Sequence, residues 1–148
     1  MPAPHTAAVV LFVCEHGAAK SVIAAEHLRR LAAERGVALD RRAAGLVPDA
    51  EFPPHVVAGL LADGLEVPRG RPHALVDDEL AAAGYVVSLG CDLGAPSPPA
   101  AARWDDLPHV SDGYGAARDA IVARVSELLI RLGGAAGGAP SSGSGASQ

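Results

Sequence analysis

The chain has 148 residues, of which 49% are hydrophobic and only 3% aromatic, and its formal net charge is −5. This length suits one domain of roughly 100–150 residues, with a core built mainly of alanine, valine and leucine. The acidic balance argues against a nucleic-acid partner, because a phosphate backbone requires a basic patch. No apolar run reaches the roughly 18 residues of a membrane helix, so we expect no membrane association. The two cysteines, Cys14 and Cys91, follow no secretory leader, which predicts a cytoplasmic protein with reduced thiols.

The first half of the chain predicts two strands and two helices. Residues 7–13 form an unbroken apolar run, as expected for a strand buried on both faces. Residues 21–35 carry apolar side chains on one face and precede a glycine, which predicts a helix. We expect a second strand over residues 37–44 and, after a proline-rich loop, a short helix over residues 54–63.

The second half continues the alternation of strands and helices. We expect a short third strand over residues 65–67, a helix with an acidic first turn over residues 77–83, and a buried strand over residues 85–89. Loops over residues 90–102 and 104–112 lead to a last helix over residues 113–132. Residues 133–148 contain no charge and consist of Gly, Ala, Ser, Pro and one Gln, which predicts a flexible tail after a domain of residues 1–132.

This alternation predicts a parallel sheet with helices on both faces, here a three-layer α/β/α domain around four parallel strands. In such sheets, ligands bind at the carboxyl ends of the strands. Cys14 follows the first strand and Cys91 a later one. We therefore expect both thiols to open onto the same edge of the sheet.

The segment around Cys14 is the strongest functional signal. Residues 9–21 read VVLFVCEHGAAKS, which predicts a strand, a loop and a helix start with a thiol at the mouth of the loop. Such a loop directs backbone N–H groups at one spot, and the helix adds the positive end of its dipole. This arrangement binds a tetrahedral oxyanion and favours a thiolate. The alternatives are an inert, buried Cys14 and a Ser21 that only caps the helix. His16 has too few companion ligands for a metal site, so we expect no metal.

The spacing Cys14-x5-Lys20-Ser21 after an N-terminal strand resembles the low-molecular-weight protein tyrosine phosphatase family, which includes thioredoxin- and mycothiol-coupled arsenate reductases. The resemblance covers residues 7 to about 132. It is strongest over residues 10–26 and weaker at residues 43–45, 86–89 and 104–108. It implies that Cys14 attacks phosphorus or arsenic, that Lys20 is the loop cation, and that Ser21 steadies the thiolate. The implied oxyanion-binding residues are Glu15, His16, Gly17, Ala18, Ala19, Lys20 and Ser21.

Two residues depart from the family pattern. The family normally has Arg at the position of Lys20, and Lys offers one flexible point charge in place of a planar fork. Loss of one such contact weakens transition-state binding by about 2–4 kcal/mol. The family also places an acidic residue after a Trp-x-x-Pro-like loop, where this chain has His109. A protonated histidine can act as the general acid. If another residue of this loop takes the position of the general acid, the alternatives are Asp105, Asp106 and Asp112. Glu15, next to the thiol, is expected to face solvent or to pair with a base.

Three functions remain open. The first is a cofactor-free cysteine-dependent phosphatase that hydrolyses phosphomonoesters, with phosphotyrosine among the candidates, through a thiophosphate intermediate. The second is an arsenate reductase, in which Cys91 or an external thiol from thioredoxin, mycoredoxin or mycothiol resolves the adduct on Cys14. The third is a catalytically silent oxyanion-binding protein, which the departures at Lys20 and His109 favour. Each function requires a small oxyanion or phosphoester as ligand.

Overall fold

Four parallel strands form the centre of the structure, a computed structural model that describes residues 8–91 and 101–137. The strands are β1 (Ala8–Cys14), β2 (Leu39–Gly45), β3 (Tyr85–Ser88) and β4 (Ala101–Arg103). Their order in the sheet is β2-β1-β3-β4, and each neighbouring pair is parallel. The prediction of a four-stranded parallel sheet is confirmed.

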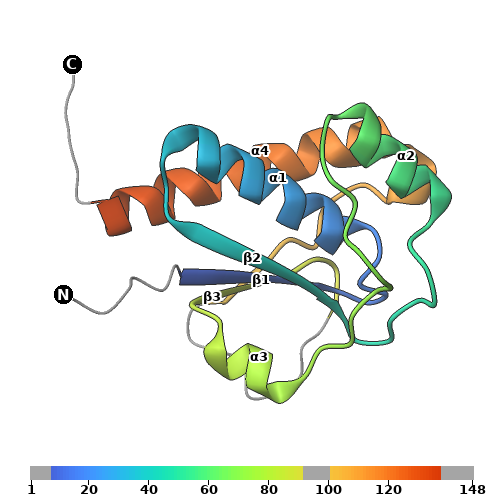
Figure 1. Cartoon of the computed structure of the whole chain (residues 1–148), viewed down its shortest axis with the longest axis horizontal. Helices are drawn as coiled ribbons and strands as arrows, with labels where there is room; N and C mark the ends of the chain where they lie inside the picture. Colours follow the sequence, from blue (N-terminus) through green and yellow to red (C-terminus); the bar gives the residue numbers. More distant parts are fainter. Residues whose placement is uncertain (1–7, 92–100, 138–148) are drawn as a thin grey trace.

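Helices cover both faces of this sheet, as predicted (Figure 1). The helices α1 (Lys20–Arg35), α2 (Pro54–Ala62) and α4 (Tyr114–Gly137) lie on one face, and α3 (Asp77–Ala82) lies on the other. Side chains alternate along β1, so Phe12 and Cys14 pack toward α1 and α4, whereas Leu11 and Val13 pack toward α3. None of the helices in the described ranges is long and apolar enough to cross a membrane.

The prediction of a strand at residues 65–67 is wrong, and the fourth strand lies in a predicted loop. Leu65 is buried in the core beside α1 and α4, and the segment that follows lines a cavity with Glu26 of α1. Leu65 therefore belongs to the core, but residues 65–67 are not part of the sheet. The true fourth strand, β4, has two alanines among its three residues. Such a segment lacks the β-branched and aromatic side chains by which strands are predicted.

The predicted last helix is too short. It ends at residue 132 in the prediction, but α4 continues to Gly137. Gly133 lies against Val37, where a Cβ on the glycine would be 3.2 Å from the valine Cγ2, so the helix still packs on the domain at that point. The predicted tail therefore cannot begin before residue 138, and residues 138–148 lie outside the described residues. A short turn of 3-10 helix, η1 (Val110–Asp112), precedes α4.

A polar cluster around Asp63 attaches α2 to the two long helices. Its carboxylate accepts hydrogen bonds from Arg118 Nη1 at 2.7 Å and from the Tyr114 hydroxyl at 2.9 Å. On the α1 side, His27 Nε2 lies 3.5 Å from Asp63 Oδ2, and Arg30 Nη1 donates to the Asp63 carbonyl oxygen at 2.6 Å. These contacts fix α2, whose first turn reaches the site described below.

We predict that His27 makes the stability of the fold depend on pH. Burial lowers the pKa of His27 below 6.5, although the charge of Asp63 opposes this shift. A histidine with a lowered pKa in the folded state contributes stability above its unfolded-state pKa and loses it as the pH falls. The free energy of unfolding in urea should therefore decline between about pH 7.5 and about pH 5.5, and it should decline less in His27→Gln.

The matched control is His55→Gln, because His55 is exposed on α2. This variant should show the wild-type dependence on pH. Equal slopes for His27→Gln and the wild type would contradict the assignment to His27.

Candidate active site

A cavity of about 390 Å³ opens where β1 and β3 end. Its walls come from the loop after β1, the first turn of α1, the segment that leads into α2, the residues after β3 and the segment before α4. Residues from these distant parts of the sequence meet here because the carboxyl ends of parallel strands share one edge. Of the predicted site residues, Cys14, Glu15, His16, Ala18, Ala19, Lys20 and His109 line the cavity.

The thiol of Cys14 lies at the end of β1 and contacts Ser21. The two residues are 7% and 0% exposed, and the Sγ atom donates to Ser21 Oγ across 3.0 Å. When the thiol loses its proton, the hydroxyl can turn and donate to the sulfur instead. The structure thus gives Ser21 the contact that its predicted role requires. Ser21 is not the helix cap, because α1 begins at Lys20 and Ala19 occupies the cap position.

Backbone hydrogen bonds orient the loop after Cys14. The N–H groups of Leu46, Val47 and Asp49 donate to the carbonyl oxygens of residues 14, 15 and 16, at 3.2, 2.7 and 3.1 Å. In a planar trans peptide, the carbonyl of one residue and the N–H of the next point in opposite directions. The N–H groups of residues 15–17 therefore point away from the segment that holds the carbonyls. Across the described residues, no protein acceptor pairs with the N–H groups of residues 15–19.

A close approach of two glycines holds the loop against the end of β2. Gly17 has a φ of +62°, and a Cβ on it would lie 2.6 Å from the backbone nitrogen of Gly45. A Cβ on Gly45 would in turn collide with the backbone of His16 and Gly17. Both positions therefore require glycine, which explains why the segment of weaker family resemblance at residues 43–45 ends on Gly45.

The positive charge of the site comes from Lys20 and the start of α1. A Cβ on Gly90 would lie 3.7 Å from Lys20 Nζ, which places the ammonium group at the cavity wall formed after β3. In the part of the chain that the structure describes, Lys20 has no carboxylate within ion-pair distance. A cation at a helix N-terminus is unfavourable unless an anion is present. The arrangement therefore favours a bound anion.

Of the four candidate general acids, only His109 lines the cavity. Asp105 pairs with Arg103 at 3.1 Å, and Asp106 pairs with Arg124 at 2.6 Å. Asp112 is exposed in η1. The structure therefore does not bring the three aspartates into the site, and it leaves His109 as the one predicted acid there.

Sequence reasoning missed two ionisable lining residues, Asp49 and His55. Asp49 Oδ1 lies 3.3 Å from His16 Nδ1, which also lies 3.1 Å from the Val47 carbonyl oxygen. His55 is in the first turn of α2. The two prolines before it predict only where the helix starts, and its approach to the cavity depends on how α2 packs. Glu15 is exposed at the rim, as expected.

Cys91 follows β3 at the same edge of the sheet as Cys14, as expected, but it does not line the cavity. It is buried with side chains that face α3, whereas Cys14 belongs to the cluster that faces α1 and α4. Its thiol donates to the Val13 carbonyl oxygen at 3.4 Å. Burial, together with the nearby Cys14, raises the pKa of Cys91 to about 11, so this thiol is protonated at neutral pH. Both cysteines are free. Within residues 8–91 and 101–137, no three His, Cys, Asp or Glu side chains are grouped to hold a metal ion.

We predict that Gly17→Ala destabilises the protein more than Gly36→Ala. Both glycines have a left-handed φ, of +62° and +67°, but a Cβ on Gly36 would meet nothing within 4 Å. The strained φ alone costs about 1–2 kcal/mol in each variant, and only Gly17→Ala adds a backbone collision. Urea denaturation measures the two losses. Equal losses would show that the Gly17–Gly45 contact imposes no constraint.

Comparisons with known proteins identify solved structures that share this fold. No protein-family model and no curated protein sequence matches the chain. Among solved structures, a thioredoxin-dependent arsenate reductase of Corynebacterium glutamicum superposes with a TM-score of 0.76 and 29% identity, over 87% of this chain and 63% of that one. The chain therefore spans less than two thirds of the length of that reductase.

Two Bacillus subtilis structures are 17% identical to the chain and show the fold alone. The protein YfkJ has a TM-score of 0.78 and covers 88% of this chain and 98% of its own. A low-molecular-weight protein tyrosine phosphatase has a TM-score of 0.71, with 84% and 96% covered. This chain therefore has the fold that low-molecular-weight protein tyrosine phosphatases and arsenate reductases share.

Proposed function

We propose that Cys14 is a nucleophile toward tetrahedral oxyanions and that the protein hydrolyses phosphomonoesters. The observation that carries the proposal is the 3.0 Å contact between Cys14 Sγ and Ser21 Oγ at the base of a loop whose N–H groups lack protein acceptors in the described residues. The hydroxyl can stabilise the thiolate while the loop binds the oxygens of the substrate. The ammonium group of Lys20, which pairs with no carboxylate among the described residues, supports the same assignment.

Hydrolysis then proceeds in two displacements at phosphorus. The sulfur of Cys14 attacks phosphorus, and the bond to the leaving alcohol breaks as His109, in its protonated form, gives that oxygen a proton. The loop N–H groups and Lys20 hold the three remaining oxygens. Water next attacks the phosphorus–sulfur intermediate, with neutral His109 accepting its proton. Inorganic phosphate leaves, and the thiolate of Cys14 is restored.

Arsenate reduction is the second candidate, and the 29% identity to the Corynebacterium reductase favours it. The sulfur of Cys14 would bond to arsenic as water leaves. A second thiol would then attack the Cys14 sulfur, so that the sulfur–arsenic bond breaks and its electron pair goes to arsenic. Arsenic(V) becomes arsenic(III), and the two sulfurs are oxidised to a disulfide. The buried, protonated state of Cys91 favours an external thiol, of the kind that thioredoxin, mycoredoxin or mycothiol supplies, as this second thiol.

We predict that phosphate, arsenate and vanadate each slow the alkylation of Cys14 by iodoacetamide. The anions occupy the loop beside the sulfur and block the reagent. The full-length protein should also hydrolyse p-nitrophenyl phosphate, and Cys14→Ser should abolish this turnover. Cys91→Ser serves as the control for thiol loss and should keep it.

Protection of Cys14 without turnover of p-nitrophenyl phosphate or arsenate would overturn both enzyme assignments and leave a silent oxyanion-binding protein. Alkylation that no anion slows would overturn the anion site itself.

If the protein reduces arsenate, we predict that Cys91→Ser retains the rate to within about twofold when an external dithiol is supplied, because a buried, protonated thiol is a poor nucleophile. The measurement is arsenite formation under reducing conditions. A loss of about tenfold or more, with p-nitrophenyl phosphate hydrolysis unchanged, would instead make Cys91 the resolving thiol.

A further inference from the structure

A second cavity adjoins the loop at Gly17 and shares no lining residue with the Cys14 cavity. Its volume is about 200 Å³, and it lies between β2, α1 and the segment of residues 68–73. Five basic side chains line it: Arg41, Arg42, Arg69, Arg71 and His73. We call this cavity the basic groove. None of its lining residues is a cysteine, serine or threonine, so it offers no nucleophile of those kinds and is suited to binding.

Two of the five basic side chains have no counter-charge. Glu79 accepts from Arg42 at 2.8 Å and lies 2.8 Å from His73 Nε2. Arg69 and Arg71 have no carboxylate within ion-pair distance anywhere in residues 8–91 and 101–137. The groove therefore carries excess positive charge in a chain whose net charge is −5.

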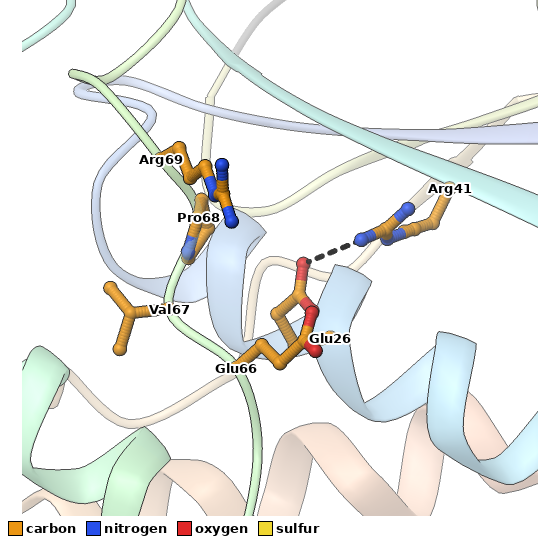
Figure 2. Close-up of a pocket in the computed structure, with 6 residues that line it drawn as sticks. All are labelled: Glu26, Arg41, Glu66, Val67, Pro68 and Arg69. Atoms are coloured by element: carbon orange, nitrogen blue, oxygen red, sulfur yellow. Dashed lines mark hydrogen bonds and ion pairs between the residues drawn. The ribbon is translucent and has the colours of Figure 1, made fainter.

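The third arginine, Arg41, lies within ion-pair distance of two carboxylates, Glu26 and Asp40. Figure 2 shows a neighbouring pocket, where the side chains of Arg41 from β2 and Arg69 from the segment after α2 lie together with the carboxylates of Glu26 and Glu66. The buried carboxylate of Glu26, which also lines the groove, lies 3.4 Å from Arg41 Nη2, and Asp40 Oδ1 lies 3.5 Å from Arg41 Nη1. Among the described residues, the positive charge that remains for a ligand therefore comes mainly from Arg69 and Arg71. Guanidinium groups that converge in this way attract an anion with several oxygens.

We propose that the basic groove binds a small phosphate-class oxyanion independently of Cys14. A dianion matches the charges of Arg69 and Arg71, which pair with no carboxylate among the described residues, and the planar guanidinium of arginine fits the oxygens of phosphate. Phe52 and Pro68 line the groove as well, and these apolar residues shield one side of the ion from water. The volume suits one tetrahedral group with a short substituent better than a folded partner.

The test is calorimetric titration of inorganic phosphate into the full-length protein after Cys14 has been alkylated with iodoacetamide, which blocks the first cavity. We expect binding to remain. We expect the double variant Arg69→Gln/Arg71→Gln to lower the affinity by at least about tenfold, because two charge-assisted contacts are lost. Arg69 and Arg71 are both exposed, so we expect the double variant to fold.

The matched control is Arg35→Gln/Arg131→Gln, which removes the same charge at exposed sites on α1 and α4. It should keep the affinity to within about twofold. Absence of binding after alkylation would overturn the proposal, and so would equal losses in the two double variants. Anion protection of Cys14 in Arg69→Gln/Arg71→Gln reports on the first cavity alone, so a failure of the basic groove is distinguishable from a failure of the proposed function.

A second arm replaces inorganic phosphate with O-phosphoserine. Tighter binding of O-phosphoserine supports a phosphate group carried on a larger molecule, and equal or weaker binding supports the free ion. Binding of neither compound overturns the proposal.

Discussion

Backbone contact between Gly17 and Gly45 sets the geometry of the candidate site. Because neither residue carries a Cβ, the loop after β1 can lie directly on the end of β2. At that separation, the segment after Gly45 donates its N–H groups to the carbonyls of the loop. The planarity of the peptide then turns the N–H groups of the loop away from that segment. An anion site made of backbone groups needs no particular side chain, which is why the loop can carry Glu15, His16 and two alanines and still be suited to an oxyanion.

The sequence was sufficient to predict the parallel sheet and the loop, since both depend on local patterns. The apolar run of β1 and the helix start that follows it are contiguous, so Cys14 and Lys20 could be placed together without knowledge of the fold. The contact of Ser21 with Cys14 followed from the family resemblance. β4 could not be predicted, because its alanines carry no strand signal and its pairing with β3 joins it to the sheet. His55 was also missed because its position depends on a contact that is distant in the sequence, namely the packing of α2 on α1 and α4.

The net charge of the chain does not reveal how its charged residues are distributed in the fold. The net charge of −5 argues against a broad basic face, but it contains no information about where individual arginines lie in the fold. The sequence separates Arg41 from Arg69 by a loop and a helix. Parallel pairing of β2 with β1 places Arg41 beside α1, and the chain after α2 returns along the same helix to bring Arg69 opposite. Positive charge thus gathers on one side of an acidic protein, next to the loop that holds Cys14.

The position of Cys91 follows from the alternation of side chains along strands. Cys14 is in register with Gly45 at the end of β1, and its side chain faces α1, whereas Cys91 packs with Val13, whose side chain faces α3. Two cysteines at one edge of a sheet can therefore still lie on opposite faces. No disulfide joins them in the structure, where both cysteines are free and buried. In the present geometry, Cys91 contributes apolar packing and a hydrogen bond to the Val13 carbonyl, while Cys14 alone faces the cavity in which an oxyanion would bind.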